Sequence, residues 1–97
     1  MSRLRFEWDE AKNVANIEKH GVSFDEAQTA FHDTNAIRFH DPDHSESEDR
    51  FLLLGLSTRL RVLIVCHCYR SDDEVIRLIS ARKANKTERN DYETYWR

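Results

Sequence analysis

The spacing of apolar residues changes near residue 35, from intervals of three and four to alternation. The first spacing is typical of a helix with one buried face and the second of a strand, so the chain divides into a helical part and a β part. Ahead of the helical part, residues 4–8 alternate as a short strand does. A helix over 10–19 follows, and Gly21 ends it. The apolar positions of this helix are Ala11, Val14 and Ile17.

A second helix begins at Ser23, because Ser23 and Glu26 have the spacing of a capping box, in which each side chain bonds to the backbone of the other residue. The apolar positions of this helix are Phe24, Ala27 and Phe31. The turn at Gly21 joins the two helices into an N-terminal helical pair.

Four strands separated by polar segments are predicted after residue 35. The first contains Ile37 and Phe39, and the others cover 50–56, 60–69 and 74–81. The connections after residue 50 are too short for parallel pairing, so these strands form an antiparallel meander. A charged segment from residue 84 to about residue 95 predicts a C-terminal helix.

These elements predict an α+β protein with one domain over 1–97: an edge strand, two N-terminal helices, an antiparallel sheet of about four strands and a C-terminal helix. With two glycines and one proline, the chain is not collagenous or of low complexity. The apolar runs, such as the one over 51–54, are too short to cross a bilayer. The opening MSRLRFEWDE turns acidic before any apolar segment, so we expect no secretory signal, no membrane association and a cytoplasmic location.

The net charge of −3 is unevenly distributed, with −6 on the first 58 residues and +3 on the remainder. A basic C-terminal part can form a local positive surface that the total charge hides. An ordinary mixed surface is the alternative interpretation.

Three basic side chains lie among apolar neighbours in the predicted sheet. Arg61 and His67 share a face of the strand over 60–69, and Arg77 has the same character on the next strand. Such placement is costly unless the side chains have partners or face an open surface. Neighbouring strands bring all three onto one surface if the register allows. Guanidinium groups bind phosphate in a bidentate manner and imidazole transfers protons near neutral pH, so the set suits a phosphodiester.

The strand that carries Arg77 ends in two further cations, Arg82 and Lys83. Strict alternation along this strand places Ser80 with Leu78 on one face and Ala81 with Arg77 on the other. The alternative for each arginine is that it pairs with a carboxylate or lies at a strand edge.

Lys19 and His20 end the first helix and add to the candidate site. The alternative for this pair is that the two cations only stabilise the helix dipole, by roughly 0.3–1 kcal/mol. The chain has no Gly-rich phosphate loop and no G-x-S-x-G segment. An enzyme built on these residues would therefore use acid–base and electrostatic catalysis.

A zinc site is a weaker alternative. The available donors are His40, Asp41, Asp43 and His44, or Cys66, His67 and Cys68. Neither group has a known zinc spacing, and alternation puts His67 opposite the two cysteines, so we expect no metal and no cofactor. The two thiols are too close in sequence to bridge without strain and are expected to be reduced and buried. The acidic segment DPDHSESED, over 41–49, is expected to be an exposed loop.

Three segments of the chain resemble the BrnT family of type II toxins. The opening segment is FEWDEAKNVANIEKHGVSFDEAQTAFHD, the middle one is HSESEDRFLLLG and the closing one is VIRLISARKANKTERNDYE. Together they cover nearly the whole chain, in the family's order and spacing.

The resemblance implies a RelE-like ribonuclease fold and a toxin that cleaves RNA and inhibits translation. It also implies a neighbouring antitoxin of the BrnA type, which neutralises the toxin and carries a dimeric ribbon-helix-helix DNA-binding region. The complex would then reach operator DNA only through the antitoxin, and RNA would be the substrate.

The resemblance places functional positions on Lys19, Arg61 and Arg77. His20, His67, Ser80 and Arg82 are matching neighbours, and Lys83 follows Arg82 at the strand end. The implied mechanism is metal-independent: the arginines hold the scissile phosphate, and a lysine or histidine deprotonates the ribose 2′-OH. A catalytically inactive module, which only docks an antitoxin or another acidic partner and takes part in operon repression, is the alternative.

Overall fold

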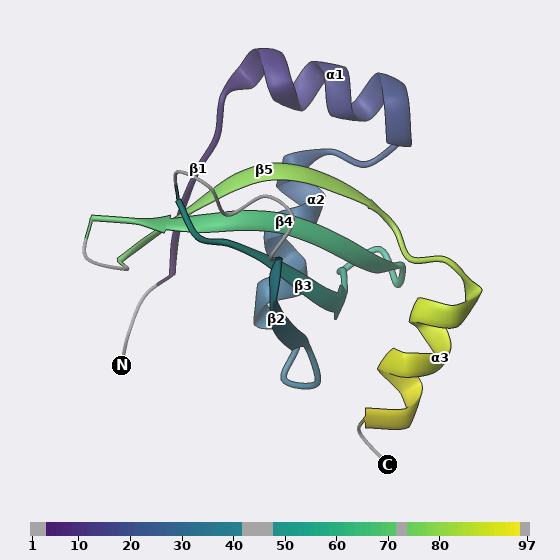
Figure 1. Cartoon of the computed structure of the whole chain (residues 1–97). Helices are drawn as coiled ribbons and strands as arrows, with labels where there is room; N and C mark the ends of the chain where they lie inside the picture. Colours follow the sequence, from purple (N-terminus) through teal and green to yellow (C-terminus); the bar gives the residue numbers. More distant parts are fainter. Residues whose placement is uncertain (1–3, 42–47, 72–73, 96–97) are drawn as a thin grey trace.

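The computed structural model describes residues 4–41, 48–71 and 74–95. It contains three α-helices, one 3-10 helix and five strands in an α+β arrangement, as predicted (Figure 1). In chain order these are β1 (Arg5–Glu7), α1 (Glu10–His20), α2 (Phe24–Thr29), the 3-10 helix η1 (Ala30–His32), β2 (Ile37–Asp41), β3 (Arg50–Leu56), β4 (Val62–Arg70), β5 (Val75–Lys83) and α3 (Lys86–Tyr95).

The five strands form one sheet in the order β1-β5-β4-β3-β2. The predicted meander from β2 to β5 is confirmed, since each of these strands pairs antiparallel with the next. The sheet was predicted to be antiparallel with about four strands, but it has five, because β1 joins it at the edge. Strand β1 lies beside β5 and runs parallel to it, so the sheet is mixed. Parallel pairing is possible here because two helices and three strands separate β1 from β5 in the chain. Phe6 fixes β1 by packing its ring edge-on against Phe31, at 5.2 Å.

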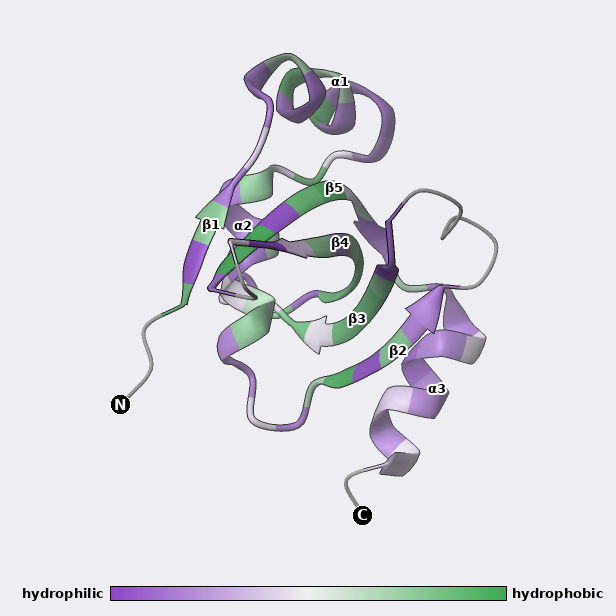
Figure 2. Cartoon of the chain, turned by 60° about the vertical axis from the view of Figure 1, so that its left-hand side comes forward, coloured by the Kyte–Doolittle hydropathy of each residue, from purple (hydrophilic) through white to green (hydrophobic). Residues whose placement is uncertain are grey.

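One face of the sheet, here called the inner face, is covered by α2 and η1 (Figures 1 and 2). Half of the predicted capping box is present at the N-terminus of α2: the Glu26 N–H donates to the Ser23 hydroxyl at 3.0 Å, but the Glu26 carboxylate accepts from Ser57 and Arg61 instead. Close packing under η1 explains Gly55: a Cβ atom there would lie 2.9 Å from the Ala30 carbonyl oxygen. The core on this face consists mainly of Val22, Phe24, Ala27, Ala30, Leu53, Leu63, Val65, Ile76, Leu78 and Ala81.

The opposite face, here called the outer face, is covered at one end by α3. Tyr92 of α3 is buried there against Leu54 and Ile64, and its hydroxyl donates a hydrogen bond to the Asp33 carboxylate. That carboxylate also accepts the Leu56 N–H at 2.8 Å, so one acid ties α3 to β3. The rest of the outer face is not covered by a helix in Figure 1.

Helix α1 docks through polar groups rather than through the predicted apolar positions. Val14 and Ile17 are 48% and 44% exposed, whereas Asn13 and Asn16 are buried. The reason is hydrogen bonding: the Phe24 N–H donates to Asn13 at 2.8 Å, and Asn16 bonds to both backbone groups of Ala81, at 2.8 and 3.0 Å. Figure 2 shows α1 as mostly hydrophilic beside the hydrophobic central strands.

A β-bulge interrupts the alternation of β5. The register passes from Cys66 opposite Ser80 to His67 opposite Leu78, which leaves Ile79 as the extra residue. As a result Ala81 joins Leu78 in the inner core, and Ser80 moves to the outer face. The predicted alternation is therefore wrong beyond residue 78.

His67 was predicted to belong to a catalytic surface, but it is a core residue. Its side chain is fully buried on the inner face, between the rings of Phe31 and Tyr69, at 4.8 and 5.4 Å. Nδ1 lies 3.1 Å from the Val65 carbonyl oxygen, and Nε2 has no hydrogen-bond partner among the described residues. Burial lowers the pKa of His67 to about 4, so the imidazole is neutral at neutral pH.

The docking of α1 predicts a contrast between two substitutions on the same helix. Asn16→Ala leaves backbone groups of Ala81 and Val22 without their partner and should reduce the free energy of unfolding by about 3 kcal/mol. Val14→Ala, at an exposed position, should change it by less than about 0.5 kcal/mol. Urea denaturation at neutral pH measures both. A larger loss in the valine variant would show that α1 is held by its apolar residues.

The burial of His67 predicts a loss of stability in mild acid. An unfolded histidine takes up a proton near pH 6.5 and the folded one only near pH 4, so this contribution is complete above pH 6.5 and decreases as the pH falls towards 4. From pH 7.5 to 5 the wild-type chain should lose about 2 kcal/mol that His67→Phe retains. Denaturation at both pH values measures the difference. His32→Gln, at an exposed histidine, is the control and should behave as wild type.

Candidate functional site

A cleft of about 330 Å³ opens on the outer face, beside the part of the sheet that α3 covers. Its volume lies within the range of roughly 300–1,000 Å³ that is typical of small-molecule sites. Side chains from α1, β2, β3, β4 and β5 contribute to it. The central cleft, as it is called below, is lined by His20, Asp41, Arg50, Leu52, Ile64, Cys66, Ile79, Ser80, Ala81 and Arg82.

The C-terminal end of α1 delivers His20 to the central cleft. Gly21 ends the helix in the left-handed conformation, with φ of 69°, and its N–H donates to the Ile17 carbonyl at 2.8 Å. Because Asn16 holds the last turns of α1 on Ala81, His20 lies next to Ser80. Lys19 lies in an adjoining hollow of about 210 Å³, which shares His20, Ile79 and Ser80 with the cleft.

The bulge in β5 places both Ser80 and Arg82 on the outer face, in the central cleft. Arg82 donates two hydrogen bonds to the Glu88 carboxylate, at 2.8 and 2.9 Å. These bonds lower the pKa of Glu88 and raise that of Arg82. Glu88 also caps α3, since it accepts the Asn85 N–H at 2.8 Å, so the guanidinium is tied to the first turn of that helix.

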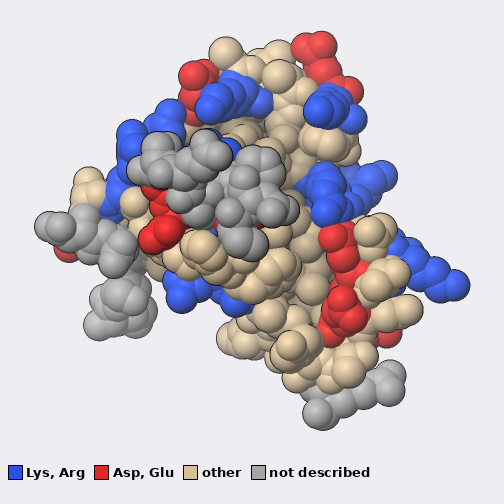
Figure 3. All heavy atoms as spheres, viewed as in Figure 1, with Lys and Arg blue, Asp and Glu red and all other residues tan. Residues whose placement is uncertain are grey.

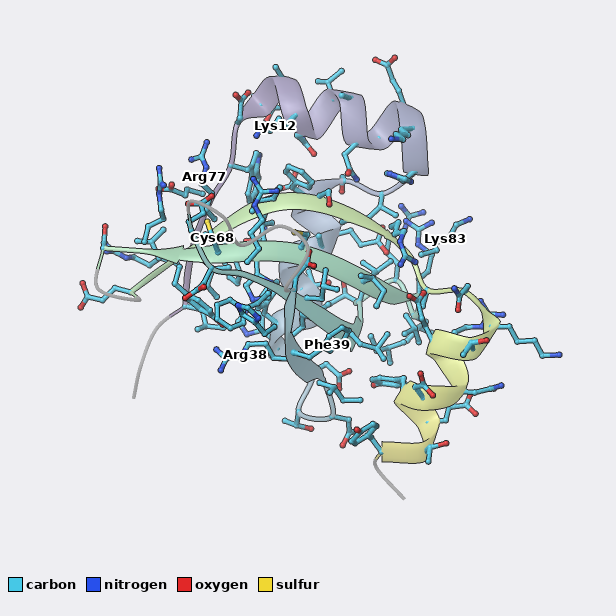
Figure 4. All side chains as sticks on the ribbon, in the orientation of Figure 1. Lys12, Arg38, Phe39, Cys68, Arg77 and Lys83 are labelled. Carbon is cyan, nitrogen blue, oxygen red and sulfur yellow. The ribbon has the colours of Figure 1, made fainter. Side chains whose placement is uncertain are left out.

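Lys83 lies at the end of β5, where its side chain is exposed (Figure 4). Figure 3 shows Lys and Arg side chains gathered on this face where the end of α1 meets the end of β5, with acidic side chains below them on α3. Lysine and arginine side chains therefore surround one end of the cleft.

Arg61 does not enter the central cleft. Its Nε donates to Glu26 of α2 at 2.9 Å, its Nη2 donates to the second oxygen of the same carboxylate, and Nη2 also reaches the Gly21 carbonyl at 3.1 Å. Glu26 is buried and accepts a further bond from Ser57 at 2.7 Å. The bond from Arg61 is the main reason that the pKa of Glu26 is low. Arg61 therefore satisfies a buried acid on the inner face.

Arg77 lies at the other end of the sheet. It donates to Glu7 of β1 at 2.8 Å and is paired in register with Cys68 on the outer face. Cys68 of β4 follows Arg61, the residue just before that strand, by seven residues, which corresponds to roughly 23 Å along the sheet. Arg77, which is paired with Cys68, is therefore separated from Arg61 by about this distance along the strand direction. Figure 4 labels Arg77 far from Lys83. The predicted convergence of Arg61, His67 and Arg77 is therefore wrong: the first two belong to the inner face and the third lies outside the cleft.

Two cleft residues were missing from the predicted catalytic and phosphate-binding set: Asp41, which was named only as a donor in the zinc alternative, and Arg50, which was not named as a site residue. They face each other across β2 and β3 and belong to the outer face. The signal that could have identified Arg50 was present in the sequence, since the alternation Arg50, Leu52, Leu54 places a cation on a strand face that is otherwise apolar.

The described part of the chain contains no group of three or more His, Cys, Asp or Glu side chains that could hold a metal ion. Asp43 and His44, which the zinc alternative requires, lie outside the described residues, as does most of the predicted acidic loop. Cys66 and Cys68 are both free thiols and both buried. Burial is the main cause that raises the pKa of each, and Cys66 lies in the wall of the cleft as a thiol rather than a thiolate.

Within residues 4–41, 48–71 and 74–95, no helix has the length and apolar composition needed to cross a membrane.

Comparisons with known proteins identify the family. The sequence profile of the ribonuclease toxin BrnT of type II toxin–antitoxin systems matches residues 8–88. Among solved structures, the crystal structure of the Brucella abortus ribonuclease toxin, BrnT, superposes with a TM-score of 0.65 at 26% sequence identity, covering 87% of this chain and 100% of that one. None of the curated proteins matches the chain. The match over residues 8–88 establishes that the chain belongs to the BrnT family of ribonuclease toxins of type II toxin–antitoxin systems.

Proposed function

We propose that this chain is an endoribonuclease toxin that cleaves RNA in the central cleft and thereby inhibits translation. The observation that carries the proposal is the grouping of His20, Ser80 and Arg82 in one cleft, with Lys19 in the adjoining hollow, in a member of a ribonuclease toxin family. These are four of the residues that the sequence predicted, and they combine a proton acceptor with phosphate-binding groups.

The proposed reaction is a transesterification within the RNA chain. His20 accepts the proton of the ribose 2′-OH, the 2′-oxygen forms a bond to phosphorus, and the bond from phosphorus to the 5′-oxygen breaks. The leaving 5′-oxygen takes up a proton from the Lys19 ammonium, which lies in the hollow that adjoins the cleft and also contains His20. The products are a 2′,3′-cyclic phosphate and a 5′-OH end, and no water or metal is consumed.

Arg82 has the role of binding the phosphate and stabilising its developing charge. A guanidinium can offer two parallel N–H donors to a phosphate, as Arg82 already does to Glu88. The substrate phosphate would therefore replace a carboxylate that occupies the same donors. Ser80 can donate a hydroxyl hydrogen bond to a phosphate oxygen, and Lys83 adds positive charge at the end of β5.

The partners follow from the family. We propose that a BrnA-type antitoxin with a ribbon-helix-helix region neutralises the chain, that the complex reaches operator DNA only through this antitoxin, and that the toxin acts in the cytoplasm, where RNA is translated. We also propose that the fold is RelE-like and that the whole of 1–97 acts as one domain. The order strand, two helices, antiparallel meander and C-terminal helix supports this.

A second function is favoured by a specific observation, the pairing of the expected phosphate-binding arginines with carboxylates. Arg61, Arg77 and Arg82 are bound to Glu26, Glu7 and Glu88 respectively. A relative that only docks its antitoxin and takes part in operon repression would keep these pairs permanently. Toxicity assays separate the two functions.

Expression of the chain in a bacterial host should arrest growth with loss of RNA, and the purified chain should cleave RNA. Arg82→Ala and His20→Gln should each lower the cleavage rate about a hundredfold or more, because each removes a group that acts in the transition state. Arg5→Ala, at an exposed arginine of β1, is the matched control and should retain full activity. Full toxicity of Arg82→Ala would exclude the proposed phosphate site, and normal growth with the wild-type chain would favour the inactive module.

Metal independence has its own test. Cleavage of RNA by the purified chain should proceed at the same rate in buffer with excess EDTA, and the 5′ fragment should carry a 2′,3′-cyclic phosphate by mass spectrometry. Loss of activity in EDTA that added Mg²⁺ restores would show that the proposed proton-transfer mechanism is wrong.

A further inference from the structure

A second, larger pocket lies on the inner face, on the opposite side of the sheet from the central cleft. Its volume is about 470 Å³ and it is open to solvent at the end of the sheet formed by β2, β3 and β4. It is lined by Arg38, Glu48, Asp49, Phe51 and Tyr69. None of these residues takes part in the proposed cleavage. The three residues Arg38, Phe51 and Tyr69 are called the aromatic platform below.

The guanidinium of Arg38 is held in place by both rings of the platform. Its Cζ lies 4.8 Å from the centre of the Phe51 ring and 5.5 Å from that of Tyr69, and its Nη1 donates to the Tyr69 hydroxyl at 2.9 Å. Phe51 and Tyr69 lie against the guanidinium, and Arg38 is an exposed residue that solvent reaches. RNA bases stack on guanidinium planes as well as on aromatic rings.

The platform is rigid because its rings are continuous with the core. Phe51 and Tyr69 pack edge-on at 5.4 Å, and both lie against the buried ring of His67, at 6.1 and 5.4 Å. A surface that is already ordered loses little conformational entropy when a ligand binds. Arg38 and Phe39 point to opposite sides of β2 in Figure 4, which agrees with the placement of Arg38 on the inner face.

The two acids of the pocket indicate what kind of group it accepts. The side chain of Asp49 is 74% exposed and lies 3.4 Å from the His40 ring, whereas that of Glu48 is 36% exposed and is paired with Arg70 at 3.6 Å and Arg50 at 4.0 Å. A carboxylate only accepts hydrogen bonds, and its charge repels phosphate. The pocket therefore suits an uncharged ligand that is flat, so that it stacks, and that presents hydrogen-bond donors along one edge.

Guanine meets this requirement better than the other bases. Its Watson–Crick edge presents two adjacent donors, N1–H and the N2 amino group, which match the two oxygens of one carboxylate. Adenine and cytosine present a ring acceptor beside their amino group, and uracil presents one donor between two acceptors. Guanine also carries the O6 and N7 acceptors that arginine commonly binds.

We propose that the aromatic platform, with Glu48 and Asp49, binds a guanine base of the RNA that the central cleft cleaves. This inference rests on the proposed function for the identity of the RNA. The two sites are connected around β2, the edge strand of the sheet: Asp41 of β2 lines the cleft on the outer face and Arg38 of the same strand lines the pocket on the inner face. A single-stranded RNA that leaves the cleft therefore has to pass only the edge strand β2 to reach the platform.

The test measures binding rather than cleavage. Single-stranded hexamers of 2′-O-methyl uridine with one central guanine or one central adenine lack the 2′-OH nucleophile, so the intact wild-type chain binds them without cutting. Fluorescence anisotropy should give a dissociation constant about tenfold lower for the guanine hexamer. Equal affinity for the two hexamers would overturn the proposal.

Variants assign the preference to the pocket. Arg38→Gln, and the pair Glu48→Gln with Asp49→Asn, should each reduce the preference for guanine to less than about twofold. Tyr69→Phe, which removes only the hydroxyl that holds Arg38, should reduce it in part. Arg59→Gln removes one charge at a side chain that is 72% exposed in the turn between β3 and β4, and it should weaken both hexamers equally. An unchanged preference in the Glu48 and Asp49 double variant would overturn the proposal.

Two further measurements distinguish the guanine site from the proposed cleavage activity, and RNA from a free nucleotide as the ligand. If the chain prefers the guanine hexamer but leaves natural RNA intact, the guanine site is supported and the ribonuclease proposal is refuted. If the chain cleaves RNA without a preference for guanine, the ribonuclease proposal is supported and the guanine site is refuted. Guanosine monophosphate should compete at least tenfold more weakly than the guanine hexamer, because it lacks the contacts along the chain. Equal competition would show that the ligand is a free nucleotide and would overturn the assignment to RNA.

Discussion

The hydrogen bonds between Asn16 and the backbone of Ala81 are the interaction on which the candidate site depends. Strand β1 pairs only with the first part of β5, over Val75–Arg77, so the later edge of β5 would otherwise lack a partner among the described residues. The Asn16 amide bonds to this edge as a neighbouring strand would. It thereby holds the end of α1, with Lys19 and His20, against the outer face. Without this contact the sheet would keep its core but not the proton-accepting side of the cleft.

The two faces of the sheet have separate tasks because their cations have different partners. On the inner face Arg61 donates hydrogen bonds to a buried acid, Glu26, and so joins α2 to the turn before β4. On the outer face Arg82 binds a carboxylate that is more accessible, that of Glu88. A buried acid loses far more than an accessible one when its partner leaves, so only the second pair can be exchanged for a substrate at moderate cost.

The elements that follow from local pattern could be predicted from the sequence, and those that depend on long-range contacts could not. The N-cap at Ser23 and the meander both follow from short spacings. The face of α1 did not, because hydrophobic periodicity gives no weight to asparagines that bond to the backbone of a distant strand. His67 was assigned to a surface because it is polar, although aromatic neighbours from η1 and β3 help to bury it. Of the predicted site, the segments around His20 and Arg82 lie together, and Arg61 and Arg77 lie apart.

The bulge in β5 sets the chemical character of the outer face through a single residue. If β5 alternated regularly after Leu78, Ser80 and Arg82 would point beneath α2, and Ala81 would point to the solvent side. The extra residue exchanges these directions for the remainder of the strand. A strand that kept Ile79 without the bulge would turn a guanidinium into the apolar interior and leave a methyl group where the phosphate is expected, whereas deletion of Ile79 would leave Ser80 and Arg82 on the outer face. A single bulge in a β-strand can in this way decide which of its side chains form a binding site.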